Sequence, residues 1–267
     1  MKKIILLFSI VPAFVACTTN AVTGRKQLSL FPESALQQEA VTQYRQFLSQ
    51  NKVVSASNNR DAEMVKRVGN RIASAITNYY RSQGLASELD GYKWEFNLVQ
   101  DNAANAWCMP GGKVVVYTGL LPITRNEAAL AIVMGHEILH AVANHGNERM
   151  SQVAVAQGLQ VAGNVFTQRN GQANAIFNNV FGPGATVGVL LPNSRKQELE
   201  ADRFGLIFAA MAGYNPQEAI PFWQRMAAAS QGNKPPEFLS SHPADESRIR
   251  KLQEYMPEAL KYYKPRK

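Results

Sequence analysis

The spacing of hydrophobic positions along the chain predicts two amphipathic helices in its first third. From Ser34 onward, apolar side chains recur every three or four residues, at Leu36, Ala40, Val41, Tyr44, Phe47 and Leu48. The segment 62–80 repeats this spacing with Met64, Val65, Val68, Ile72 and Ile76. Such a period gathers the apolar side chains on one face of a helix. Packing of that face against a core is a sufficient explanation for both helices.

The pattern then changes to one that is typical of strands. Residues 92–99 alternate between apolar and polar positions, which predicts a half-buried strand. The residues KVVVYTG, 113–119, predict a second strand after the turn Pro110-Gly111-Gly112. Further helices are predicted from about Asn126 and near 194–211, 216–229 and 243–256. The sequence therefore predicts an α+β fold that is predominantly helical and has a small sheet.

Residues 151–190 are rich in apolar residues and carry no charge apart from Arg169. The glycine-bearing stretch 170–193 could form a lid over a cleft, which the sequence alone does not decide. No segment of 34 residues or similar length is repeated, so the pattern does not predict a helical-repeat domain.

The N-terminus is typical of a secretory signal peptide. Residues 1–16 have a short basic start, an apolar run too short to cross a bilayer, and small residues before Cys17. The sequence FVAC resembles a bacterial lipobox, although Phe14 stands in place of the more usual leucine, and an ordinary signal peptide is the alternative. We expect a signal peptide at 1–16, a lipidated N-terminus and tether at 17–33, and one folded domain at 34–267.

Composition adds little to this picture. The chain is 46% hydrophobic and 18% charged, as globular proteins are. Its formal net charge of +8 includes Lys2 and Lys3 of the predicted signal peptide, and no cluster of basic residues indicates nucleic-acid binding. If Cys17 carries lipid, Cys108 is a lone buried thiol, whereas a disulfide between the two is the alternative. No later segment has the roughly 18 to 20 apolar residues of a membrane span.

Three of the four histidines lie in the stretch MGHEILHAVANHG, residues 134–146. His136 and His140 are four positions apart on a predicted helix, so both imidazoles can reach one metal ion. Glu137 is rotated by about 100 degrees from His136, which places it beside the metal, where it can accept a proton from water. The alternative is a buried helix with two ordinary histidines, which would be costly in such apolar surroundings.

A zinc site requires a third protein ligand. The longer HExxHxxGxxH pattern is absent, because Ala143 replaces its glycine and His145 lies one position out of register. We therefore interpret His145 as a structural residue at the helix end. The segment SRKQELEADRFG places Glu198 and Asp202 on one helix face while Glu200 points away. From spacing alone, a solvated acidic helix start explains these residues equally well.

The combination of HExxH with ExxxD some sixty residues later resembles zinc metallopeptidases of the CAAX-prenyl-protease and HtpX type, the gluzincins. The segments NAVTGRKQLSLF, NAWCMPGGKVVVYTGLL, GHEILHAVANHG, SRKQELEADRFG, AGYNP and SHPADESRI occur in the order of that family. The resemblance is greatest to its soluble periplasmic lipoprotein branch, which includes BepA and LoiP. It implies a zincin-like domain with one Zn²⁺ held by His136, His140 and Glu198. Asp202 would accept a hydrogen bond from a ligating imidazole.

The resemblance also implies which residues bind the substrate. The segment Asn105–Tyr117 would be an edge strand that pairs with an extended peptide. His242 would face the metal, either donating to the oxyanion or occupying the open zinc position, with an exposed helix-cap histidine as the alternative. Arg248 would assist, and Tyr214 is a weaker candidate for the role of His242. The expected substrate-binding residues are Asn105, Gly111, Gly112, Val114, Val116 and Arg248.

Together these features predict a zinc-dependent metalloendopeptidase in which Glu137 and His242 are catalytic. The expected substrates are extended or unfolded envelope proteins, and outer-membrane assembly machinery is a candidate partner. The expected location is the bacterial cell envelope, with a lipid on Cys17 anchoring the protein to the outer membrane, facing the periplasm. The alternative is a non-catalytic chaperone or assembly factor that retains the fold, although the intact Glu137 favours an enzyme.

Overall fold

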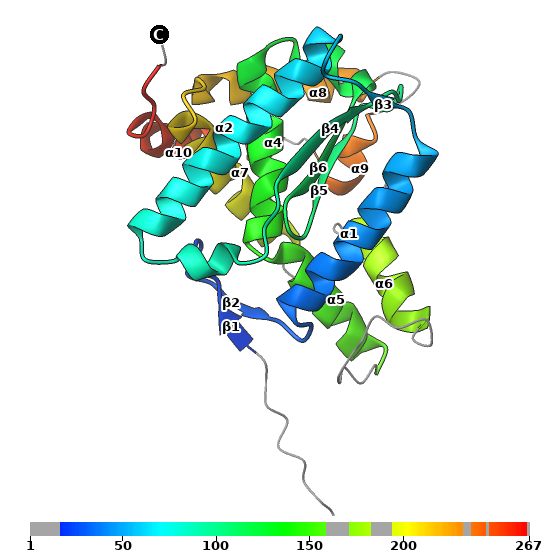
Figure 1. Cartoon of the computed structure of the whole chain (residues 1–267). Coiled ribbons are helices and arrows are strands. Elements are labelled where there is room, and N and C mark those ends of the chain that lie inside the picture. The colour runs from blue at the N-terminus through cyan, green and yellow to red at the C-terminus, as the bar shows by residue number, and fades with distance from the viewer. Residues whose placement is uncertain (1–16, 159–170, 183–193, 232–235, 244–245, 266–267) are drawn as a thin grey trace, which may run out of the picture.

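The computed structural model describes residues 17–158, 171–182, 194–231, 236–243 and 246–265 (Figure 1). Its helices are α1 (Glu33–Gln50), α2 (Arg60–Ser82), α3 (Leu121–Thr124), α4 (Glu127–Val142), α5 (His145–Ala156), α6 (Gly171–Phe181), α7 (Ser194–Met211), α8 (Ala219–Ala229), α9 (Phe238–Ser241) and α10 (Glu246–Leu260). Its strands are β1 (Cys17–Thr19), β2 (Lys26–Leu28), β3 (Val53–Val54), β4 (Glu95–Val99), β5 (Ala106–Met109) and β6 (Lys113–Tyr117). The predicted class, a mostly helical α+β fold with a small sheet, is confirmed.

A four-stranded mixed sheet lies beside α4, with its strands in the order β3-β4-β6-β5. Strands β4 and β6 are parallel, and Glu95 pairs with Lys113 at the start of their register. Strands β5 and β6 are antiparallel and are joined by a tight turn in which Gly111 and Gly112 both have positive φ. In the described sheet β5 is the outermost strand next to α4, so only one of its two edges is paired within the sheet.

Helix α4 occupies the centre of the molecule, between the sheet and α7 (Figure 1). Every one of its residues from Ala129 to Val142 is buried. A helix that is apolar nearly all round has no face suited to solvent, so it is covered on all sides. The helix begins after Asn126, whose side chain accepts a hydrogen bond from the backbone N–H of Ala129. It ends before Asn144, whose φ of 53° redirects the chain into α5.

Two glycines let α4 and α7 approach each other closely. A Cβ atom on Gly205 would lie 2.9 Å from the backbone nitrogen of His136. A Cβ atom on Gly135 would lie 2.8 Å from the carbonyl oxygen of Gly205. Neither distance is compatible with a side chain at these positions unless the helices separate. This close crossing brings side chains from both helices together next to His136.

A short hairpin, formed by β1 and β2, lies at the C-terminal end of α4 and the start of α5 (Figure 1). Asn20 and Gln27 of this segment are buried, with 5% and 4% of their surface exposed. The segment is therefore packed against the domain, which its turn-rich sequence did not indicate. The predicted signal peptide, residues 1–16, lies outside the described residues.

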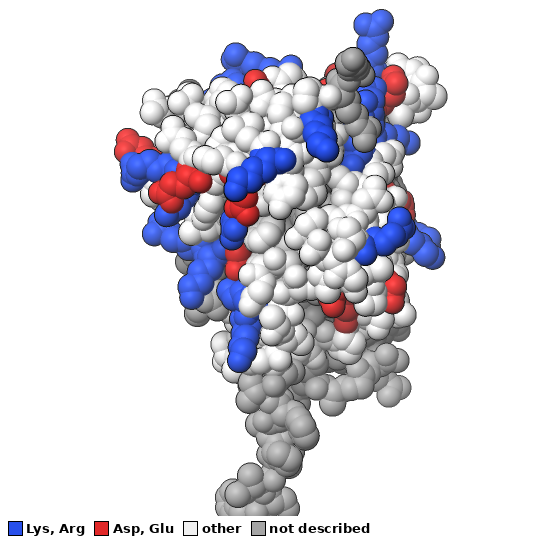
Figure 2. Space-filling view, turned by 90° about the vertical axis from the view of Figure 1, so that its left-hand side faces the viewer, with Lys and Arg blue, Asp and Glu red and all other residues white. Residues whose placement is uncertain are grey.

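Of the stretch considered as a lid, residues 171–182 are described and contain α6, whereas 183–193 lie outside the described part of the chain. Among the described helices, none combines the length and the hydrophobicity needed to cross a membrane. Figure 2 shows that on one face of the molecule Lys and Arg side chains are dispersed and interleaved with Asp and Glu. This matches the scattered distribution of basic residues along the sequence.

Candidate metal centre

Four side chains from three parts of the fold converge beside the middle of α4. His136 and His140 come from α4, Glu198 comes from α7, and His242 directly follows α9. One nitrogen or oxygen atom of each lies within 4.8 Å of the corresponding atoms of the others. The three histidines are buried and Glu198 is partly buried. The three implied ligands are thus brought together, and His242 joins them as a fourth.

The separations between these atoms fit a single divalent cation. His136 Nε2 lies 3.1 Å from His140 Nε2 and 3.4 Å from Glu198 Oε2. His140 Nε2 lies 3.3 Å from Glu198 Oε1, and His242 Nδ1 lies 3.1 Å from His136 Nε2. Ligand atoms about 2.0 to 2.1 Å from a tetrahedral zinc ion are about 3.3 Å from one another. Three imidazole nitrogens and a carboxylate oxygen are also a donor set that zinc accepts.

The balance between burial and pairing sets the charges of the cluster. Burial lowers the pKa of His140 well below its ordinary value. Burial alone would raise the pKa of Glu198, but His242 and His140 hold it well below its usual range. Burial opposes protonation of His136, but the carboxylates of Asp202 and Glu198 outweigh it and raise the pKa of His136 to about 9. An ionised Glu198 and a neutral His140 are in the protonation states that bind a cation.

Glu137 lies beside the cluster, as its position in the motif predicts. Its Oε1 is 4.0 Å from His136 Nε2 and 3.3 Å from His242 Nε2. This oxygen is buried and has no hydrogen-bond partner among the described residues. Burial raises the pKa of the Glu137 carboxyl. A buried carboxylate oxygen normally has a partner, so this one is suited to bind a molecule that enters the site.

Asp202 and Arg248 hold the outer nitrogen of His136. His136 Nδ1 lies 3.1 Å from Asp202 Oδ1, while Arg248 donates to both oxygens of Asp202 at 2.8 and 2.7 Å. The guanidinium of Arg248 also lies over the ring of Trp223, 3.6 Å from its centroid. Because Nε2 of His136 faces the cluster, its Nδ1–H donates to Asp202, which fixes the orientation of the ring.

His145 occupies the corresponding position behind His140. Its Nδ1 lies 2.9 Å from His140 Nδ1, and its Nε2 lies 2.9 Å from Glu200 Oε2. Burial lowers the pKa of His145. As expected, His145 stands outside the four-residue cluster and Glu200 points away from it. The contact between His145 and a ligand was missed, because a helix break at Asn144 brings the two rings together and helical spacing does not reveal it.

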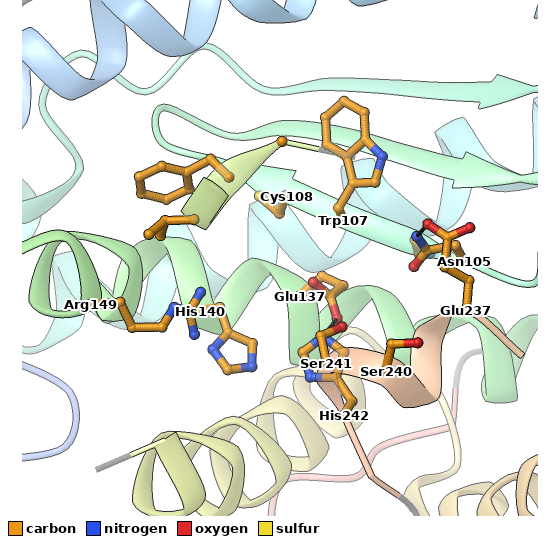
Figure 3. A pocket seen from close by; sticks show the side chains of 14 residues that line it. Asn105, Trp107, Cys108, Glu137, His140, Arg149, Glu237, Ser240, Ser241 and His242 are labelled. Atoms are coloured by element: carbon orange, nitrogen blue, oxygen red, sulfur yellow. Dashed lines mark hydrogen bonds and ion pairs between the residues drawn. The ribbon is translucent and has the colours of Figure 1, made fainter. Parts of the chain in front are cut away.

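A pocket opens between β5 and α9, next to the cluster (Figure 3). Figure 3 shows Glu137 and His140 on one side of this pocket and Asn105 and Trp107 on the other. Asn105 Nδ2 donates to Glu237 Oε1 at 3.0 Å, a contact that links the start of β5 to the start of α9. The pocket is lined by Asn105, Ala106, Trp107, Cys108, Glu137, His140, Arg149, Val180, Phe181, Gly182, Glu237, Ser240, Ser241 and His242.

The structure corrects part of the expected substrate-binding set. Asn105 lines the pocket, and its role in binding substrate stays a prediction. Strand β6, however, has a hydrogen-bonded strand on each side, and Val114 and Val116 are fully buried. Their predicted contact with a peptide is wrong, because the backbone of β6 is already paired and the open edge belongs to β5. Gly111 and Gly112 form the turn beyond β5 and lie outside the pocket lining.

Arg248 and Tyr214 also lie elsewhere than expected. Arg248 is 5% exposed and supports Asp202 rather than lining the pocket. The hydroxyl of Tyr214 donates to Glu127 Oε2 at 3.3 Å, at the start of α4. That position is about two and a half helical turns from His136. Tyr214 is therefore too far from the cluster to replace His242.

A buried HExxH helix, a carboxylate ligand from a second helix and a glutamate with a buried oxygen free of hydrogen bonds beside them are the arrangement of a metallopeptidase. The chain belongs to Peptidase family M48, whose model matches residues 59–256. This range includes the four residues of the cluster and Glu137. The predicted membership of a metallopeptidase family is thus confirmed, while the lipoprotein branch stays a prediction.

The relatives of this chain include metalloendopeptidases and a protease. It is 35% identical over 205 residues to mitochondrial metalloendopeptidase OMA1 of Schizosaccharomyces pombe, covering 74% of this chain and 59% of that protein. It is 38% identical over 184 residues to the OMA1 of Saccharomyces cerevisiae, covering 66% and 51%. It is 29% identical over 182 residues to the beta-barrel assembly-enhancing protease of Escherichia coli, covering 65% and 37%. The chain spans between about a third and three fifths of these relatives.

Proposed function

We propose that this protein is a zinc-dependent endopeptidase that cleaves extended or unfolded polypeptides. The observation that carries the proposal is the buried Oε1 of Glu137, which has no hydrogen-bond partner among the described residues and lies beside a cluster of ligands spaced for one cation. A zinc ion bound there would polarise the scissile carbonyl and make water a better nucleophile.

In this reaction Glu137 holds the attacking water and accepts its proton. The water oxygen forms a bond to the carbonyl carbon, the carbon–nitrogen bond breaks, and Glu137 passes the proton to the leaving amine. Burial raises the pKa of the Glu137 carboxyl, which suits this exchange because the carboxylate then accepts a proton more readily than a solvated one does. His242 lies close enough to the other three side chains to hold the same cation in a resting state, which supports that alternative; it would then have to leave the metal before a water molecule took its place.

The open edge of β5 supports an extended substrate. Its residues 106–108 border the pocket, and a peptide that added a strand to this edge would lie across the side chains of Glu137 and His140. Such pairing uses the peptide backbone, so it needs little side-chain identity. It does need a segment free of its own secondary structure, which favours unfolded proteins as substrates.

We further propose that the protein acts in quality control at the cell envelope. The sequence of residues 1–16 and the lipobox ending at Cys17 support an anchor in the outer membrane, facing the periplasm. One relative is named a beta-barrel assembly-enhancing protease, which supports outer-membrane assembly machinery as a partner. Unfolded envelope polypeptides would then be the substrates, without a role for nucleic acid.

The deciding variant is Glu137→Gln. It should bind zinc in the same stoichiometry as the natural protein and retain its thermal unfolding curve, yet lose cleavage of an unfolded casein-like substrate. If this variant still cleaves the substrate, Glu137 is not the base. His136→Ala is the matched control, because it should lose the metal itself. An unchanged zinc content in that variant would show that zinc is not bound at this cluster. If Glu137→Gln restores growth of a deletion strain, binding rather than cleavage is the biological activity.

A further inference from the structure

The side of His140 that faces away from the pocket is connected to the N-terminal hairpin. His140 Nε2 faces the cluster, so Nδ1 carries the proton and donates to His145 Nδ1 at 2.9 Å. His145 then carries its own proton on Nε2, which donates to Glu200 Oε2 at 2.9 Å. In this order each imidazole carries one proton, and each of the two hydrogen bonds has one donor and one acceptor.

Arg25 completes this chain of contacts from the hairpin. Its Nε donates to Glu200 Oε1 at 2.7 Å and its Nη2 to Glu200 Oε2 at 3.2 Å. The same guanidinium donates to both oxygens of Glu148, at 2.7 and 2.6 Å. Arg25 therefore binds α7 and α5 at once, in the forked geometry that arginine provides and lysine does not. Gln197 also donates to Glu148, at 2.7 Å.

The hairpin that carries Arg25 is itself fixed to the end of α4. Asn20 Nδ2 donates to the carbonyl oxygen of Ala143 at 2.7 Å, three residues beyond His140. The Oδ1 atom of Asn20 accepts from the backbone N–H groups of Val22 and Thr23, and the N–H of Asn20 donates to the carbonyl of Arg25. These contacts define the turn, so the position of Arg25 relative to α4 is set by the structure.

We propose that Arg25 is a positioning residue for the metal centre, acting on the ligand His140 through Glu200 and His145. The N-terminal hairpin is then a support of the metal site and not merely a link between an anchor and the domain. The proposal rests on the metal-binding part of the proposed function. It assigns a role in zinc affinity to Arg25, which lies 111 positions before His136, the nearest ligand in sequence.

The physical effect is on the orientation of one imidazole. A ligating histidine whose outer nitrogen has a fixed acceptor is held in the rotamer and tautomer that bind the metal, and loss of that acceptor typically weakens binding 10- to 100-fold. His145 is held in place by Glu200, and Glu200 by Arg25. The effect should therefore decrease along the chain of contacts, from His145 to Arg25.

The test is zinc affinity of the purified full-length protein, measured by competition with a chromophoric chelator. His145→Phe, which removes both hydrogen bonds at similar size, should weaken zinc binding about 10- to 100-fold. Arg25→Ala should weaken it roughly threefold to tenfold, and Arg25→Lys less. Arg203→Ala is the matched control, because Arg203 makes an equally forked pair with Glu258 but has no contact with the cluster. It should leave zinc affinity unchanged.

A double variant separates positioning from a loss of general stability. If Arg25 acts through His145, then adding Arg25→Ala to His145→Phe should weaken zinc binding no further. The visible absorption spectrum of the Co²⁺-loaded protein provides a second readout, since it reports the ligand geometry. It should change in both single variants and stay unchanged in Arg203→Ala.

The outcomes distinguish this inference from the proposed function. Zinc binding by the natural protein together with unchanged affinity in Arg25→Ala and His145→Phe overturns the positioning role and leaves the endopeptidase proposal intact. The positioning role is also overturned if the factors by which the two single variants weaken zinc binding multiply in the double variant, because the two residues would then act independently. Failure of the natural protein to bind zinc would overturn the proposed function itself, and with it the role of Arg25.

Discussion

His136 and His140 lie four positions apart on one helix, yet different kinds of structure hold their outer nitrogens. Behind His136 is an ion pair between two packed helices, formed by Asp202 and Arg248. Behind His140 is a longer chain of contacts that reaches the N-terminal hairpin at Arg25. The first support is built from the core of the domain, whereas the second depends on a segment at its edge.

The two supports also differ in their exposure to solvent. The side chains of Asp202 and Arg248 are 2% and 6% exposed, while those of Glu200 and Arg25 are each 17% exposed. A desolvated ion pair cannot lose one partner without leaving a buried charge poorly compensated, whereas a partly solvated pair can. The support behind His136 should therefore govern stability as well as metal binding, and the support behind His140 chiefly metal binding.

The largest expected effect comes from Asp202→Asn. Arg248 would keep its charge in a buried site while losing the nearer of its carboxylate partners, with Glu198 remaining at 3.4 Å, so the free energy of unfolding should fall by about 3 kcal/mol. The matched change Glu200→Gln should lower it by about 1 kcal/mol, because Arg25 retains Glu148 and water. Urea unfolding of the metal-free proteins measures both losses. Equal losses would show that the two supports are alike in energy.

Local patterns in the sequence account for one part of the site. The spacing of His136 and His140 and the apolar residues around them predicted a buried helix with two ligands on one face. Glu198 and Asp202 were only implied by the family resemblance, because spacing alone also fitted a solvated helix start. The sequence could place each pair, His136 with His140 and Glu198 with Asp202, on one helix face because each pair lies on one continuous helix, where spacing determines which side chains point the same way.

The remaining features depend on contacts between distant segments. Alternation of residues predicted strands but not their order in the sheet, so the open edge was assigned to a segment that includes the interior strand β6. The polar, turn-rich sequence around Arg25 predicted a tether. Its packing against the domain was missed because the carboxylate partners of Arg25 are more than 120 positions away in sequence. Nothing in the local sequence of either segment indicates its partner.

A second prediction concerns the helix crossing that both supports share. Gly205→Ala would place a Cβ atom against the backbone of His136, so α4 and α7 must separate slightly. We expect a loss of about 1 to 3 kcal/mol in stability and weaker zinc binding, because Glu198 and Asp202 move with α7. Gly171→Ala, at an open position of α6, is the control and should be nearly neutral. Zinc affinity that is unchanged in Gly205→Ala would show that the site tolerates this separation.

The smallest expected effect is a pH dependence on the hairpin side. Burial raises the pKa of Glu33, at the start of α1, to about 7. Three residues earlier, the backbone N–H of Leu30 donates to Ser151 of α5, the helix that begins with His145. Because the pKa of Glu33 is higher in the folded than in the unfolded state, the folded protein loses stability as pH rises from about 4.5 to 7.

Glu33→Gln removes the ionisation and should therefore stabilise the protein at pH 8 by on the order of 1 kcal/mol, with a smaller gain at pH 6 and no gain from this source at pH 4. Urea unfolding at the three pH values measures this difference. Glu63→Gln, on an exposed position of α2, is the control and should leave the pH profile of stability unchanged. If the gain at pH 8 is absent, the segment next to the hairpin moves enough to hydrate the ionised Glu33, and this edge of the domain is less rigid than its contacts indicate.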